Sequence, residues 1–125
     1  MTGGMNDATT PIGELRRRVA AFVRERAWEP FHSPKDLAAA LVVEASELLE
    51  IFLWKASSES EAMVGQPDLR ARVLEELADV VILACDLANR MGADVAGAVE
   101  AKLAANARKY PVERSKGSNA KYTEL

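Results

Sequence analysis

The sequence predicts an all-α protein with four long helices in a bundle-like arrangement. Period-2 alternation of apolar and polar residues, which is typical of strands, is absent, and the helix start and stop signals fall at helical spacings. The chain has 125 residues, of which 49% are hydrophobic, enough for one packed core and too few for two ordinary domains. We therefore expect one domain over residues 11–112, between a flexible tail at residues 1–10 and a second tail at residues 113–125.

The first two predicted helices begin with a hydroxyl residue followed directly by proline. Thr10 and Ser33 occupy these starting positions. A serine or threonine hydroxyl can accept a hydrogen bond from a free backbone N–H of the first turn, and proline is tolerated at the first helical position. We expect Thr10 to cap a helix ending near Arg26, and Ser33 to cap a helix ending near Lys55.

The second half of the chain contains a loop and two further predicted helices. Residues 56–67 are rich in serine and contain glycine and proline, which indicates a solvated loop with room for a short helical turn. A third helix is expected over residues 68–91, ending at Gly92, because glycine suits the left-handed position after a helix. A fourth is expected over residues 94–110, capped by its first residue and closed by Pro111.

Composition excludes several classes of protein. The longest apolar runs, residues 37–43 and 80–85, are far shorter than the roughly 20 residues of a membrane-spanning helix, so no membrane partner is expected. No secretory signal pattern precedes the domain, and a cytoplasmic location is expected. A net charge of -3 argues against binding a nucleic-acid polymer. Cys85 is the only cysteine, and its apolar neighbours predict a buried, unreactive thiol.

Four acidic residues fall on apolar helix faces. On a helical wheel, Glu44 and Glu47 lie inside a stripe of leucine and isoleucine on the second predicted helix. Glu76 and Asp79 have the same spacing and the same surroundings on the third. A solvated surface explains most single acidic pairs in helical proteins, but two matched pairs embedded among apolar residues favour a site.

A carboxylate in an apolar environment is costly unless it is paired or bound to a cation, and four facing carboxylates also repel one another. Magnesium prefers carboxylate oxygens and water, so we expect Glu44, Glu47, Glu76 and Asp79 to bind Mg²⁺. A di-iron bundle would need Glu-x-x-His motifs on two helices, whereas His32 is the only histidine.

Six segments form an ordered set around these acids. They are residues 28–34, 40–50, 52–55, 75–80, 106–111 and 121–125. The set resembles the MazG-like, all-α nucleoside triphosphate pyrophosphohydrolases, and most closely their dCTP pyrophosphatase branch, over residues 26–125. The resemblance implies hydrolysis between the α and β phosphates of a nucleoside triphosphate, which yields a monophosphate and pyrophosphate and cleanses the nucleotide pool.

The resemblance also implies a role for each site residue. Magnesium would be held by the four acids, and Glu47 is our choice for orienting or deprotonating the attacking water. Trp28 and Trp54 match residues that line the base pocket, where two indole rings can stack on a flat base. Trp54 also falls beside the acidic stripe on the wheel, ten positions after Glu44 on the same predicted helix. His32 is expected to hydrogen-bond the base or the sugar, or to make a structural contact.

The fourth predicted helix carries the remaining candidates. Lys102, Asn106 and Lys109 are expected to contact the sugar or the phosphates, although a solvated surface is the usual place for lysine. Two positions depart from the family pattern. Val43 replaces a glutamate of the broader family, and Leu83 replaces a tyrosine near the base pocket, which leaves base selectivity open.

Three functions remain in competition at this point. The first is hydrolysis of dCTP or a modified dCTP, the second is hydrolysis of dUTP or a broad set of triphosphates, and the third is nucleotide binding without catalysis. The second predicted helix is apolar almost all round and needs cover on more than one side. We therefore expect a homodimer or, as the resemblance implies, a homotetramer.

Overall fold

The computed structural model describes residues 3–125 and leaves out the first two residues of the predicted N-terminal tail. All regular secondary structure in the described range is helical, which confirms the all-α prediction. The chain forms two compact units, one ending at Ala93 and the other starting at Asp94, and each is described by itself. The elements in chain order are α1 (Ile12–Glu25), η1 (Glu29–Phe31), α2 (Pro34–Glu50), α3 (Ser57–Met63), α4 (Pro67–Met91), α5 (Val95–Lys109), α6 (Val112–Ser115) and η2 (Tyr122–Glu124).

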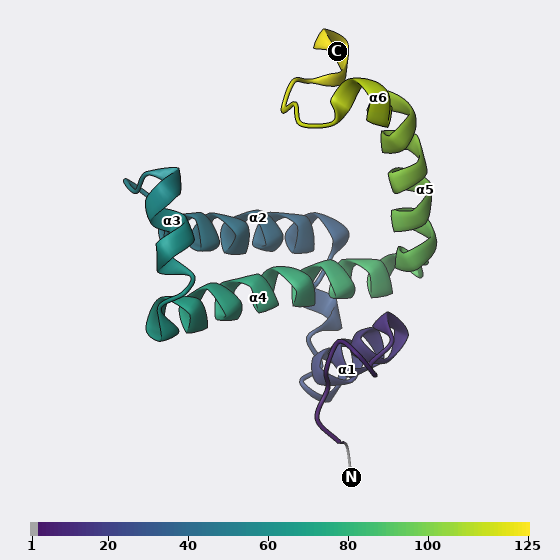
Figure 1. Cartoon of the computed structure of the whole chain (residues 1–125). Helices are drawn as coiled ribbons and strands as arrows, with labels where there is room; N and C mark the ends of the chain where they lie inside the picture. The colour runs from purple at the N-terminus through teal and green to yellow at the C-terminus, as the bar shows by residue number, and fades with distance from the viewer. Residues whose placement is uncertain (1–2) are drawn as a thin grey trace. The chain divides into compact units, whose positions relative to one another are not determined.

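The first unit is organised around a pair of antiparallel helices. Helices α2 and α4 lie side by side over most of their length, and α1 packs against α4 (Figure 1). The short helix α3 connects the two at one end of the pair. Leu37 of α2 is the most deeply buried large side chain, with 2% of its surface exposed. The first unit therefore contains three of the four predicted long helices, while the fourth, α5, belongs to the second unit.

Most predicted helix ends agree with the structure. The Ser33 hydroxyl accepts a hydrogen bond from the backbone N–H of Asp36 at 3.1 Å. Gly92 closes α4 in the left-handed region with φ at 60°, and Asp94 caps α5 by accepting from the backbone N–H of Gly97. The short helical turn expected between α2 and α4 is present as α3.

Two predicted details of the helix ends are wrong. Thr10 does not cap α1, because the N-cap position is Pro11, and the Thr10 hydroxyl accepts a hydrogen bond from Asn6 instead. Helix α2 ends at Glu50, not near Lys55, because the next backbone N–H groups bond to carbonyls three residues back and tighten the chain into turns. Residues 51–55, which were expected to extend α2, therefore do not follow its helical periodicity.

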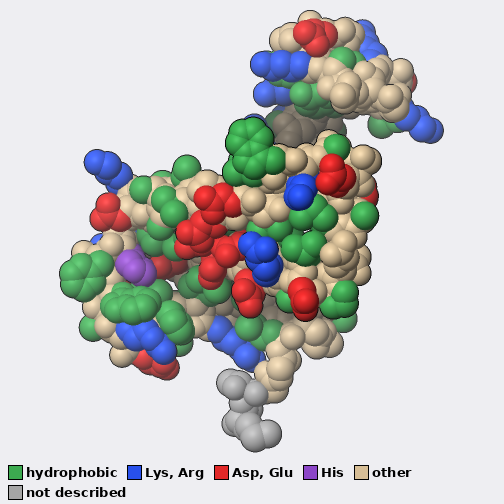
Figure 2. Space-filling model, turned by 90° about the vertical axis from the view of Figure 1, so that its left-hand side faces the viewer, with side chains coloured by type: hydrophobic (Ala, Val, Ile, Leu, Met, Phe, Trp, Pro, Cys, Tyr) green, Lys and Arg blue, Asp and Glu red, His purple; other side chains and the backbone are tan. Residues whose placement is uncertain are grey.

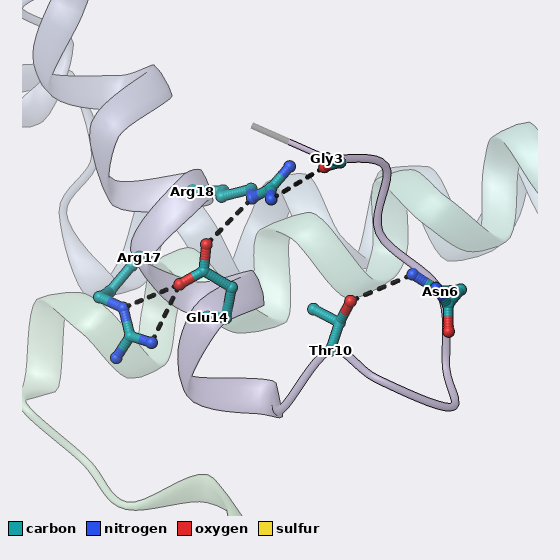
Figure 3. Close-up of polar contacts among 6 residues, drawn as sticks. All are labelled: Gly3, Asn6, Thr10, Glu14, Arg17 and Arg18. Atoms are coloured by element: carbon teal, nitrogen blue, oxygen red, sulfur yellow. Dashed lines mark hydrogen bonds and ion pairs between the residues drawn. The ribbon is translucent and has the colours of Figure 1, made fainter. Parts of the chain in front are cut away.

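The segment before α1 is held by local hydrogen bonds (Figure 3). The backbone N–H of Asn6 donates to the Thr10 hydroxyl, and Arg18 of α1 donates to the carbonyl of Gly3 at 3.2 Å. Glu14 accepts from the Arg18 guanidinium and so steadies that arginine. Part of the predicted N-terminal tail is thereby anchored to α1.

The second unit contains α5 and the segment predicted as a C-terminal tail. Within that segment the structure forms most of α6 and all of η2. Tyr122 of η2 packs edge to face on Tyr110 at the end of α5, with ring centroids 6.0 Å apart. This aromatic contact brings the end of the chain back onto α5.

None of the helices in residues 3–125 is both long enough and apolar enough to cross a membrane. Cys85 is buried, as expected, with 4% of its surface exposed. Burial raises the pKa of its thiol, which disfavours the reactive thiolate.

We predict that Ser33→Ala lowers the free energy of unfolding by about 1 kcal/mol, because it removes the N-cap of the helix that carries Glu44. Urea unfolding followed by circular dichroism measures the change. Ser58→Ala is the matched control, because Ser58 is exposed and its side chain forms no hydrogen bond within residues 3–125. Equal losses in the two variants would contradict the role of Ser33.

Candidate active site

The antiparallel packing of α2 and α4 brings three of the predicted acids together. One carboxylate oxygen from each of Glu44, Glu47 and Glu76 lies within 4.8 Å of the other two. Glu44 and Glu76 are half-buried between the helices, whereas Glu47 is exposed to solvent. We call these three residues the acidic triad.

Two oxygens of the acidic triad have no hydrogen-bond partner within residues 3–125. Glu44 Oε2 and Glu76 Oε2 are buried and accept no hydrogen bond. Within residues 3–125, no lysine or arginine forms an ion pair with any triad residue. A buried carboxylate oxygen without a donor or counter-charge is costly, so the site calls for a cation. Three carboxylates at this spacing provide the hard oxygen ligands that a divalent cation such as Mg²⁺ prefers.

The crowding of carboxylates changes their acidity. The pKa of Glu44 rises from 4.5 to about 7, first because of its burial and then because of the adjacent carboxyl group of Glu47. The pKa of Glu76 is raised in the same direction, again by burial first and then by the charge of Glu47. A cation that binds here therefore competes with protons near neutral pH.

Asp79 lies at the edge of the acidic triad. It is exposed, one turn beyond Glu76 on α4, and its carboxylate is not among the oxygens within 4.8 Å of one another. Its negative charge nevertheless raises the pKa of both Glu44 and Glu76. The structure thus groups three of the four predicted acids closely and leaves the fourth within electrostatic reach.

Trp28 and His32 lie close together beside the start of α2. Trp28 follows α1 in a turn where Ala27 adopts a left-handed φ of 52°. The Trp28 ring contacts Phe22 edge to face at 5.8 Å and lies 6.0 Å from the His32 ring. Figure 2 shows the single histidine on the same face of the molecule as a gathering of acidic side chains.

Sequence reasoning did not assign Asp86, which the structure joins to His32. Asp86 is buried on α4, and its Oδ2 lies 2.7 Å from Nδ1 of His32. A signal was present in the sequence, because Asp86 follows Asp79 by seven residues and so shares a helix face with it inside an apolar run.

Trp54 does not lie on α2, the helix on which the sequence predicted it. Because α2 ends at Glu50, Trp54 lies in a turn with a left-handed φ of 65°, and 96% of its surface is exposed. The expectation that it lies beside the acidic stripe on α2 is therefore wrong, and any contact with a base must come from this exposed turn.

The remaining candidates lie on α5 in the second unit. Lys102 and Lys109 are exposed, and Asn106 is half-buried. The Lys109 ammonium lies 5.0 Å from the centre of the Tyr122 ring, within range of a cation–π contact. These three residues occur at intervals of four and three along one helix and so share a face.

Comparison with known proteins agrees with the chemistry of this site. The model of the MazG-like family matches residues 39–125. The dCTP pyrophosphatase 1 of Rattus norvegicus is 46% identical over 114 residues, which cover 91% of this chain and 67% of that protein. The Bos taurus protein of the same name is 42% identical over 125 residues, which cover 99% of this chain and 74% of that protein.

A solved structure has a similar fold. It is a pyrophosphatase from Archaeoglobus fulgidus, with a TM-score of 0.75 and 33% sequence identity. The match covers 86% of this chain and 99% of the archaeal chain. The likeness therefore extends over nearly the whole archaeal protein.

We predict that Glu44→Gln stabilises the metal-free protein at pH 8. The pKa of Glu44 is raised in the folded state, so its contribution to stability is complete below about pH 4.5 and is lost as the pH rises through about 7. Glutamine does not ionise, so the variant does not lose this contribution to stability as the pH rises. In the presence of EDTA, the melting temperature of the variant should exceed that of the wild type at pH 8, and the difference should shrink towards pH 5.

Adding Mg²⁺ at pH 8 should reverse this order, because a cation that binds the folded state raises the melting temperature of the wild type. Glu50→Gln, an exposed position on the same helix, is the control and should respond like the wild type. Identical melting curves for Glu44→Gln and wild type at pH 8, with and without Mg²⁺, would refute the acidic triad as the metal site.

Proposed function

The chain belongs to the MazG-like family, and on that premise we propose that it is a magnesium-dependent nucleotide pyrophosphohydrolase that converts dCTP, or a modified dCTP, to the monophosphate and pyrophosphate. The acidic triad carries this proposal, because its two unpartnered buried oxygens call for the divalent cation that triphosphate chemistry uses. Removal of non-standard or excess nucleotides from the precursor pool is the corresponding cellular role.

The metal would be held by Glu44, Glu47 and Glu76, with Asp79 at the edge of the group. When bound, Mg²⁺ neutralises phosphate charge and polarises the phosphorus–oxygen bonds that the reaction breaks. The carboxylates would keep the cation at the interface of α2 and α4, where their own mutual repulsion is offset by its charge.

Glu47 is the proposed residue for activating water. It is the exposed member of the acidic triad, so its carboxylate is accessible both to solvent and to the site. A carboxylate there can accept a proton from the water that attacks the α-phosphate. The half-buried Glu44 and Glu76 are less accessible for this role.

The nucleotide would be bound by aromatic and basic side chains. Trp28 offers a half-exposed indole face for stacking on a base, and 41% of its surface is exposed. Trp54 and His32 would also contact the base or the sugar. For the phosphates and the sugar, we propose the α5 residues Lys102, Asn106 and Lys109.

Self-association is part of the proposal, because two apolar surfaces remain on the first unit. Helix α2 exposes Val42, Val43 and Leu49, with more than half of each side chain accessible. A cavity of about 490 Å³ between α1 and α4 is lined mostly by apolar side chains such as Phe22 and Leu77. Surfaces of this kind in a small chain support a homodimer or homotetramer.

We predict that Glu47→Gln lowers kcat for dCTP by about 100-fold or more, because glutamine cannot accept a proton from water. The products are measured as monophosphate and pyrophosphate, with Mg²⁺ present and a panel that includes dCTP, 5-methyl-dCTP and dUTP. Glu50→Gln is the matched control and should retain the wild-type rate.

Orthophosphate as the direct product would exclude cleavage between the α and β phosphates. Faster turnover of dUTP than of dCTP would overturn the proposed base. Binding of dCTP without any product from the wild type would indicate a nucleotide-binding module in place of an enzyme.

We predict that the wild type sediments as a dimer or tetramer and that Val42→Lys combined with Leu49→Lys produces smaller species. Two lysines on the exposed apolar face of α2 would have to be desolvated in any interface that buries it. Sedimentation velocity measures the change, and Lys35→Gln on the same helix is the control. A wild type that sediments as a monomer at micromolar concentration would refute self-association.

A further inference from the structure

Asp86 is the one charged side chain that the structure buries within residues 3–125, with 7% of its surface exposed. It lies on α4, the helix that carries Glu76, and its carboxylate is not among those of the acidic triad. Its Oδ2 is 2.7 Å from Nδ1 of His32, which precedes α2. Burying a carboxylate is costly unless it is hydrogen-bonded, so this short contact accounts for the position of Asp86.

The contact defines which nitrogen of His32 carries a proton. An ionised carboxylate can only accept hydrogen bonds, so Nδ1 of His32 must be the donor. In a neutral imidazole with the proton on Nδ1, the other nitrogen, Nε2, is an acceptor. A buried carboxylate behind a histidine is a known way to set both its tautomer and its ring orientation.

His32 lies beside Trp28, the residue proposed to stack on the base of the nucleotide. The His32 side chain is 24% exposed, and its ring lies 6.0 Å from the ring of Trp28. Trp28 also contacts the ring of Phe22, with the two ring planes at 74° to each other. The imidazole therefore sits next to the surface proposed for stacking the base.

We propose that Asp86 is a positioning residue that holds His32 in the Nδ1–H tautomer, so that Nε2 accepts a hydrogen bond from an N–H or O–H group of the bound nucleotide. The proposal rests on the proposed function and adds a specificity device to it. An acceptor selects donor groups, such as the exocyclic amine of cytosine or a sugar hydroxyl, and disfavours a carbonyl at the same place.

The tautomer can be measured without any enzymatic turnover. Because His32 is the only histidine, a long-range ¹⁵N–¹H spectrum of the full chain reports this one ring. At pH 8 the wild type should show a protonated Nδ1 and an unprotonated Nε2, and a non-hydrolysable dCTP analogue with a methylene group between the α and β phosphates, added with Mg²⁺, should shift the Nε2 resonance. In Asp86→Ala the proton should redistribute towards Nε2. A wild type with its proton on Nε2, a spectrum that Asp86→Ala leaves unchanged, or an Nε2 resonance that the dCTP analogue and Mg²⁺ leave in place would overturn the proposal.

Kinetics then identify the donor on the nucleotide. Loss of one hydrogen bond predicts that Asp86→Ala raises KM for dCTP about tenfold with little change in kcat. If the donor is the cytosine amine, KM for dUTP should not change; if it is the sugar hydroxyl, KM for 2′,3′-dideoxy-CTP should not change. An equal rise for all three substrates would mean a general structural role and would overturn the proposal.

Two further variants keep the test independent of folding. Asp86→Asn preserves size and can still accept from Nδ1, but it can also donate, so both tautomers and an intermediate KM are expected. In a His32→Gln background, Asp86→Ala should cause no additional rise in KM, because the two residues act through one hydrogen bond. A further rise in that background would show that Asp86 acts elsewhere. If the wild type hydrolyses no nucleotide, the proposed function fails, while the nitrogen spectrum and its response to the dCTP analogue still decide this inference.

Discussion

The site depends on repulsion between the carboxylates of the acidic triad, which no basic side chain in residues 3–125 neutralises through an ion pair. Glu44 and Glu76 face each other across the interface of α2 and α4, with Glu47 within 4.8 Å and no lysine or arginine paired to them among the described residues. Packing of the two helices holds these charges together at the expense of stability in the absence of a cation. The same arrangement that destabilises the metal-free protein prepares a site for a cation and a triphosphate.

Two hydrogen-bonded connections tie the surrounding elements to the second half of α4. Asp86 accepts from His32 and thereby holds the segment that contains Trp28. Three residues further along, Asn89 accepts from the Arg16 side chain and donates to the Arg16 carbonyl, which fixes α1. Helix α4 thus acts as the common support, with the acids towards its middle and the connections to α1 and the aromatic segment beyond them.

The described chain has a thin core for its length, and this limits what one copy can stabilise alone. Few large side chains approach full burial, while α1, α2 and α4 all retain exposed apolar residues. The family match over residues 39–125 includes most of α2, all of α4 and the whole second unit, so the α5 candidates belong to the same matched segment as the acids. Self-association is the physical means by which the exposed apolar faces would be covered.

The sequence by itself determined the helices and predicted the grouping of the acidic residues, because helix ends and helix faces depend on residues close together in the chain. Serine and aspartate caps, a left-handed glycine and apolar periodicity defined the helices, and the spacing of the acidic residues predicted that Glu44, Glu47 and Glu76 come together. Only the tertiary structure decided the rest. The chain turns after Glu50, so Trp54 does not lie on the helix that the periodicity predicted for it. The hydrogen bond between Asp86 and His32 joins residues that are 54 positions apart in the sequence. Helical periodicity ends where a helix ends, and it carries no information about contacts between residues that only packing brings together.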